Sequence, residues 1–214
     1  MFLLLSTIPL FDFLLIKLFG KKARWFQLHA IINIIICFLI GQQTIELIFT
    51  PKLPLDNHNE NNIISLEMVI ILHIYHYFID DLSFIEWCHH ICFVAFGVLP
   101  VLFLYNNIIS SVFLFAGCGF PGAIEYTMLT MVKHNKITSL KQKKINSLIN
   151  NYIRFPISIY GISLAHINNC NNGICKVLDY YIQFLVFVNG TFFNKMAIEN
   201  YIFHNYNNFY NKNI

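Results

Sequence analysis

The chain has 214 residues, of which 57% are hydrophobic and only 12% are charged, and its formal net charge is +3. Because soluble domains usually carry about 25% charged residues, this composition argues against a soluble protein and favours a membrane protein. Most of the six cysteines lie inside apolar runs, so a secreted disulfide framework is not expected. The sequence contains no internal repeat, glycine-rich phosphate loop or DNA-binding motif, so no nucleic-acid partner is expected.

Long apolar runs follow one another along the chain. Each is close to the roughly 20 residues that an α-helix needs to cross a bilayer. The runs cover residues 2–19, 26–49, 63–80, 84–105, 108–132, 152–167 and 177–203. We therefore expect an all-α, polytopic membrane helix bundle of about six to seven transmembrane helices. The first run has no basic residues before it, so residues 1–19 are expected to be an uncleaved N-terminal membrane anchor.

Basic residues set the expected orientation of the bundle. Lys21, Lys22 and Arg24 follow the first run, and five lysines lie in the loop expected at 133–151. Cytoplasmic loops of membrane proteins carry an excess of lysine and arginine. We therefore expect a luminal N-terminus and a cytoplasmic C-terminus, which ends in a polar tail at residues 206–214.

The stretch HIYHYFIDDLSFIEWCHH, residues 73–90, concentrates ionisable side chains between two apolar runs. On a helix, His73, His76, Tyr77 and Asp80 form one stripe, at positions i, i+3, i+4 and i+7. A charge that faces the lipid costs about 2.5 to 3.5 kcal/mol on insertion scales, so the stripe should face the interior of the bundle.

A short turn follows this stripe, and the next helix carries Glu86, His89 and His90. The turn should bring Asp80 or Asp81 close to the paired histidines across an antiparallel helix pair. Histidine can take and give a proton near neutral pH, and a neighbouring carboxylate orients its ring. The pattern therefore predicts general-base or nucleophilic acyl chemistry. The alternative is a set of buried polar groups that hold the helices together.

Metal binding is a weaker interpretation of the same residues, because the chain has no HExxH motif and no CxxC pair. No metal site is therefore expected. In the fifth run, Pro121 should kink the helix, and Glu125 follows the kink within the membrane. An intramembrane glutamate is a functional-site candidate, although a hydrogen bond to a neighbouring helix explains it equally well.

Other polar residues inside apolar runs are also expected to face inward, namely His29, Asn33, Glu46 and Arg154. For Arg154 the alternative is that the side chain extends to the lipid headgroups at the cytoplasmic surface.

The order of four segments resembles that in TLC-domain proteins, the family that groups Lag-type ceramide synthases with the translocating-chain-associating membrane protein. The segments are RWFQLHAIINIIICF (24–38), HIYHYFIDD (73–81), WCHHICFVAFG (87–97) and GFPGAIEY (119–126). The resemblance covers residues 20–205, which would form the TLC domain. It implies the TLC fold, an endomembrane bundle around a lipid-accessible cavity. His89 and His90 match the paired histidines that are implicated in N-acyl transfer from acyl-CoA to a sphingoid base. Where the synthases carry an HDxSD block, this chain reads GFPGAIEY, so it resembles a smaller member distinct from them.

The resulting hypothesis is a multi-pass membrane protein of lipid metabolism. It would transfer an acyl group from acyl-CoA, as a co-substrate, to a lipid amine or alcohol, with no other cofactor. The candidate catalytic residues are His89, His90, Asp80 and Asp81, and the candidate substrate-binding residues are His73, His76, Tyr77, Glu86 and Glu125.

Two other functions fit the same residues. One is a non-catalytic TLC protein that binds membrane lipids and regulates membrane composition. The other is a small transporter that uses Glu125 and the histidines as a proton relay. The expected location is the endoplasmic reticulum or another endomembrane, or a host membrane if the protein is viral.

Overall fold

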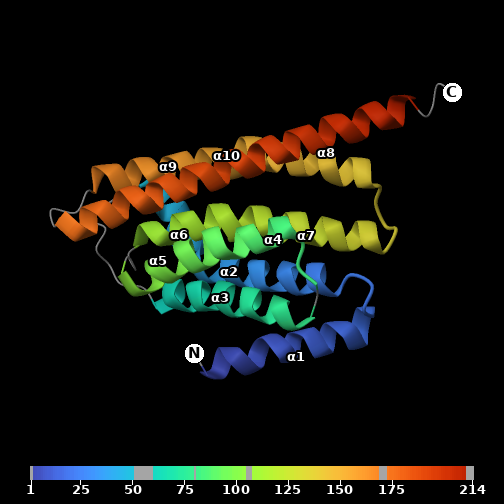
Figure 1. The fold of residues 1–214 in the computed structure, drawn as a ribbon, viewed down its shortest axis with the longest axis horizontal. Coiled ribbons are helices and arrows are strands. Elements are labelled where there is room, and N and C mark those ends of the chain that lie inside the picture. The colour runs from blue at the N-terminus through green and yellow to red at the C-terminus, as the bar shows by residue number, and fades with distance from the viewer. Residues whose placement is uncertain (1, 51–59, 80, 105–107, 169–172, 211–214) are drawn as a thin grey trace.

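The computed structural model describes residues 2–50, 60–79, 81–104, 108–168 and 173–210. In these ranges the chain is all-helical and contains no strand, and its helices form seven rods (Figure 1). Three rods are the single helices α1 (Phe2–Phe19), α2 (Arg24–Phe49) and α3 (Glu60–Ile79). The next two are α4 (Phe84–His89) with α5 (Leu99–Leu104), and α6 (Ile108–Leu114) with α7 (Phe120–Lys133). The last two are α8 (Ser139–Ile149) with α9 (Phe155–Ile167), and α10 (Gly173–Tyr210).

Each of the three composite rods is joined by a π-helical segment, in which the backbone hydrogen bond closes one residue later than in an α-helix. These segments are η1 (His90–Val98), η2 (Phe115–Gly119) and η3 (Asn150–Arg154). Pro121 and Pro156 lie in the first turns of α7 and α9, just after η2 and η3. A proline has no backbone N–H to donate to the preceding turn, and both prolines lie where the rod passes from π-helical to α-helical hydrogen bonding.

The expected apolar runs are all helical, but two segments expected to be irregular are helical as well. Residues 139–149 form α8, where the sequence predicts a basic loop. The hydroxyl oxygen of Thr138 accepts a hydrogen bond from the backbone N–H of Lys141 and so caps this helix. Likewise α10 continues to Tyr210, into the segment expected to be a polar tail.

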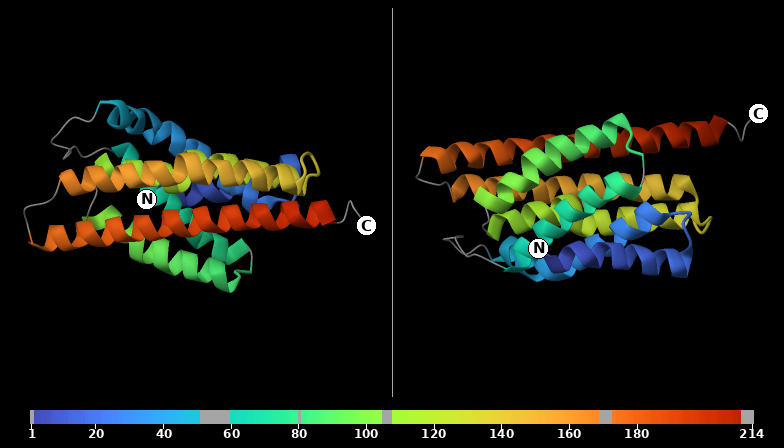
Figure 2. Two further views of the ribbon diagram at one scale, coloured as in Figure 1. Left: turned by 90° about the horizontal axis from the view of Figure 1, so that it is seen from above. Right: turned by 60° about the horizontal axis from the view of Figure 1, so that its bottom comes forward.

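Successive rods run antiparallel. The turns that join α1 to α2, α3 to α4 and α7 to α8 lie toward one end of the bundle, together with the C-terminal end of α10 (Figures 1 and 2). The N-terminal end of α1 lies toward the other end. This arrangement brings the polar residues that precede α4 to the same end as the basic turn between α7 and α8.

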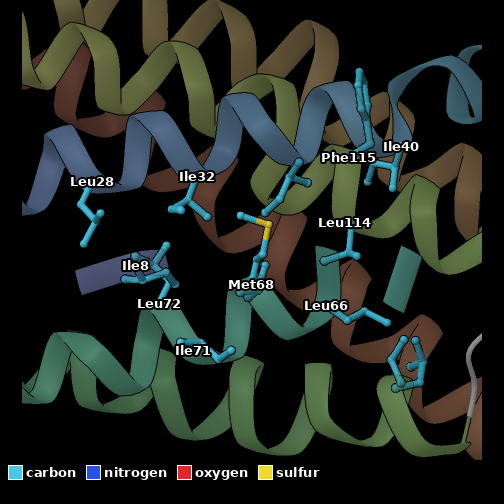
Figure 3. Packing of buried hydrophobic residues seen from close by; sticks show 14 of the residues in the cluster. Ile8, Leu28, Ile32, Ile40, Leu66, Met68, Ile71, Leu72, Leu114 and Phe115 are labelled. Carbon is cyan, nitrogen blue, oxygen red and sulfur yellow. The ribbon is translucent and has the colours of Figure 1, made fainter. Parts of the chain in front are cut away.

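The apolar core is centred on α2, which packs against α1, α3 and α7. Leu28, Ile32, Ile36 and Ile40, four residues apart, are each fully buried along one stripe of α2. Figure 3 shows three of them facing side chains of α1, α3 and the α6–α7 rod. The partners include Ile8, Met68, Leu72, Leu114 and Phe115.

A buried ion pair attaches α1 to this core. Asp12, which stands inside an apolar run, accepts hydrogen bonds from Nε of Arg24 (2.9 Å) and from the hydroxyl of Tyr75 (2.8 Å). Asp12 is 2% exposed. A buried carboxylate is tolerated when it is paired and hydrogen-bonded, so these contacts explain an acidic residue at this position.

Four of the rods are long and apolar enough to cross a membrane, within the described residues: Arg24–Phe49, Glu60–Ile79, Phe84–Leu104 and Ile108–Lys133. Many large apolar side chains also lie on the outside of the bundle, among them Phe38, Phe78, Phe103 and Phe184. Exposed apolar surface on this scale is unusual for a soluble monomer. The fold is therefore compatible with a membrane protein.

Candidate functional site: a cavity with a histidine wall

A partly open cavity of about 380 Å³ lies between the rods. Most of its wall consists of aliphatic and aromatic side chains from α2, α3, the rods 84–104 and 108–133, and α10. The polar or amphipathic residues of the wall are Trp25, His29, Asn33, His73, Glu86, His89, Ser110, Glu125, Tyr126, Arg154 and Asn189. An apolar cavity with a few convergent polar groups is the usual form of a small-molecule site.

The π-helical segment η1 shapes one wall of the cavity. His89, Phe93, Gly97 and Val101, four residues apart, all line it. On an α-helix each step of four residues would drift by about 40°, so His89 and Val101 would point about 120° apart. The wide turns of η1 offset this drift, and the four positions stay on one face.

Five histidines from three rods gather at the cavity. His29 comes from α2, His73 and His76 from α3, and His89 and His90 from the junction of α4 with η1. Neighbouring rings lie close together, with centroids 5.5 Å apart for His29 and His73 and 5.6 Å apart for His73 and His89. The inward orientation expected for the histidines is therefore observed for His29, His73, His76 and His90, which are all buried, and for His89, which lines the cavity.

Aromatic rings fix the histidines on α2 and α3. Trp25 stacks on His76, with centroids 3.4 Å apart, and meets His29 edge-on at 4.0 Å. Tyr126, from α7, stacks on the ring of His29, with centroids 4.2 Å apart. These contacts hold the rings of His29 and His76 by packing.

The adjacent pair His89 and His90 do not share one environment. His89 lines the cavity, whereas His90 does not. Nε2 of His90 lies 3.3 Å from Nδ1 of His76, which is also outside the cavity wall. Tyr77 is exposed, and its ring packs against Trp87 and His90. The structure thus places His90, His76 and Tyr77 behind the wall or outside it.

Of the acidic residues around the histidines, the structure describes Asp81 and Glu86. Asp80 lies outside the described residues, and Asp81 is exposed in the turn before α4. Glu86 lines the cavity, but its Oε2 accepts hydrogen bonds from the backbone N–H of Ser83 (2.8 Å) and from the Ser83 hydroxyl (2.6 Å). This reciprocal capping box begins α4. It holds the carboxylate of Glu86 at the helix terminus.

Glu125 and Arg154 form a second polar group that lines the cavity. Glu125 accepts a hydrogen bond from Asn146 of α8 (3.0 Å) and lies 3.5 Å from Arg154. Arg154 also donates to the side-chain oxygen of Asn150 (2.7 Å) and to the backbone carbonyl of Ala116 (3.2 Å). Arg154 is buried and points into the bundle, so it does not extend to the headgroups. The cation is retained inside because a carboxylate and two carbonyl oxygens satisfy it.

The asparagines of this group belong to a four-residue repeat in the sequence, which the abundance of asparagine in the chain conceals. Asn146, Asn150, Arg154 and Ser158 repeat every four residues, and each contacts the next by a hydrogen bond. In a chain rich in asparagine such a repeat does not stand out.

Among the other residues expected to face inward, Asn33 is buried, whereas Glu46 is exposed. Glu46 lies in the last turn of α2, where its exposed carboxylate accepts a hydrogen bond from Gln42 (2.9 Å).

Within the described part of the chain, no group of three or more His, Cys, Asp or Glu side chains is arranged to hold a metal ion.

In comparisons with known proteins, no family model, no curated protein and no solved structure matches this chain. The fold and the site therefore define only an all-helical, membrane-compatible bundle around an apolar cavity with a histidine wall. Its function has to be argued from the chemistry of that cavity.

Proposed function

We propose that this protein is a multi-pass membrane protein of lipid metabolism with the TLC fold. The resemblance in the order of its motifs supports the family, and the four long apolar helices support the membrane location. In this proposal α1, the rod 139–167 and α10 complete six to seven spans. The bundle resides in the endoplasmic reticulum or another endomembrane, or in a host membrane for a virus, with a luminal N-terminus and a cytoplasmic C-terminus.

The ligand of the cavity is a lipid chain. The cavity of about 380 Å³ falls within the usual range of small-molecule sites, about 300 to 1,000 Å³. Leu66, Val69, Leu72 and Ile182 are among the apolar side chains that line it. An alkyl chain fills such a wall without leaving polar groups unpaired, and the surrounding bilayer supplies it.

The reaction that the wall supports best is acyl transfer from acyl-CoA to a lipid amine or alcohol. The observation that carries this proposal is the position of His89, which lines a largely apolar cavity beside His73. Imidazoles in such a place can move the proton that the acceptor must lose when it attacks the thioester. Lys133 at the end of α7 and Lys136 in the turn before α8 would attract the phosphates of coenzyme A.

One observation favours a second candidate, a non-catalytic lipid-binding protein that regulates membrane composition. Nδ1 of His89 is enclosed by protein and has no hydrogen-bond partner. Histidine bases in hydrolases are usually oriented at this atom by a carboxylate. Glu86, which also lines the cavity, instead caps α4 through Ser83.

Acyl transfer can be tested directly in membranes that contain the protein. Membranes would be incubated with labelled acyl-CoA and a panel of sphingoid, glycerolipid and sterol acceptors. The wild type would be compared with His89→Ala and with His166→Ala, a control at an exposed histidine near the end of α9. A labelled lipid that is absent only in His89→Ala supports catalysis, because general acid–base catalysis contributes a factor of about 10² to 10⁴. If no acceptor is acylated by the folded wild type, the binding function is favoured.

A further inference from the structure

The tautomer of His73 is fixed by its own helix. Nδ1 of His73 lies 2.7 Å from the backbone carbonyl oxygen of Val69. A carbonyl oxygen only accepts hydrogen bonds, so Nδ1 carries the proton, and Nε2 of the neutral ring carries the lone pair. Nε2 makes no hydrogen bond with a described residue, and protein atoms do not fully enclose it. Because His73 lines the cavity, this lone pair is open to the cavity.

His89 has the opposite arrangement. Its Nδ1 is enclosed and has no partner, so a proton there would have no acceptor. Its Nε2 is not fully enclosed by protein, and His89 lines the same cavity as His73. A proton on Nε2 can be donated to a cavity ligand. The centroids of the two rings lie 5.6 Å apart, so a donor on His89 also complements the lone pair on His73.

We propose that His73 and His89 form the functional pair of this cavity, with Nε2 of His73 as the proton acceptor and the Nε2–H of His89 as a hydrogen-bond donor. The adjacent pair His89 and His90 does not fill this role, because His90 is turned toward His76 and away from the cavity wall. This assignment rests on the acyl transfer proposed above, and it adds a residue from α3 to the reaction.

The two rings have different roles in the reaction. As the acceptor's nitrogen or oxygen forms its bond to the acyl carbon, the proton of that N–H or O–H moves to Nε2 of His73. The Nε2–H of His89 meanwhile donates a hydrogen bond to the acyl oxygen, on which negative charge develops. When the carbon–sulfur bond of the thioester breaks, the proton on Nε2 of His73 moves to the sulfur, so coenzyme A leaves as the thiol and His73 returns to its starting form.

The tautomers can be measured without any turnover. The protein would be labelled with ¹⁵N-histidine, reconstituted in lipid nanodiscs and examined by NMR, since the two neutral tautomers have distinct nitrogen shifts. His73→Asn and His89→Gln assign the two signals, and His166→Gln serves as an exposed control. We expect the Nδ1–H tautomer at His73 and the Nε2–H tautomer at His89. The reversed pattern at either residue overturns the assignment.

Turnover supplies the second readout. His73→Asn keeps an amide donor for the carbonyl of Val69 but removes the nitrogen that faces the cavity, so the helix is preserved. Its kcat should fall by a factor of about 10² to 10⁴ with little change in KM. An unchanged kcat would refute the role of His73. If the wild type acylates no acceptor but both tautomers are as expected, acyl transfer is refuted and the donor–acceptor pair is supported.

Discussion

Gly161 lies in a tight contact between α9 and α6, and it allows a quantitative test of the packing. A Cβ at this position would lie 2.8 and 3.0 Å from two ring carbons of Phe113 and 3.1 Å from a methyl carbon of Val112. Overpacking of this kind costs about 1 to 3 kcal/mol. Alanine in a helix regains about 0.8 to 1.0 kcal/mol relative to glycine. Gly161→Ala should therefore leave the protein unchanged or destabilise it by up to about 2 kcal/mol.

Gly117 provides a matched control for this substitution. A Cβ there would meet no atom within 4 Å, so Gly117→Ala should be neutral or stabilise the protein by about 0.4 to 1 kcal/mol. Both variants gain helix propensity, so the difference between them isolates the contact with Phe113, about 1 to 3 kcal/mol. The free energy of unfolding would be measured by SDS titration in mild-detergent micelles. Equal stability of the two variants would refute the close approach of α9 and α6.

Three further perturbations test other parts of the structure. Asp12→Asn should destabilise the protein by about 1 to 3 kcal/mol, because a buried charged acceptor is lost; unchanged thermal unfolding in micelles would count against the docking of α1. Arg154→Ala should lower the free energy of unfolding by about 3 to 5 kcal/mol, because it breaks a buried ion pair. Lys195→Ala breaks an exposed ion pair and should lower it by only about 0.3 to 0.5 kcal/mol. Similar losses for the two variants in the same denaturation assay would contradict the buried network. In microsomes, a glycosylation tag in 168–176 should be modified and one in 133–144 should not, and the reverse pattern would invert the proposed orientation.

The helices themselves could be predicted from the sequence, because long apolar runs of this kind are stable only as helices in a bilayer. Helix α8 could not, since its lysines resemble a loop and its buried face consists of polar residues such as Gln142 and Asn146. The cap at Thr138 was the local signal for it.

The site was predictable as a cluster but not in its orientation. The spacing of His73 and His76 indicates a buried stripe, and both are buried. Which histidine faces the cavity depends on how each helix is rotated, and a sequence pattern does not specify this. The separation of His89 from His90 follows from the junction of α4 with η1, and the inward position of Arg154 depends on partners from two other segments, η2 and α7, as well as on Asn150 of its own segment.

The π-helical segments change what the loss of one residue would do to a rod. If one residue were deleted from η1, the backbone could re-form regular α-helical hydrogen bonds at little cost. About eleven steps of 100° would then separate His89 from Val101, so the two side chains would point about 20° apart and both would stay on the wall. A deletion in a regular α-helix such as α2 has no such compensation, and every later residue would turn by about 100°. The loss of one residue should therefore be tolerated better in η1 than in α2.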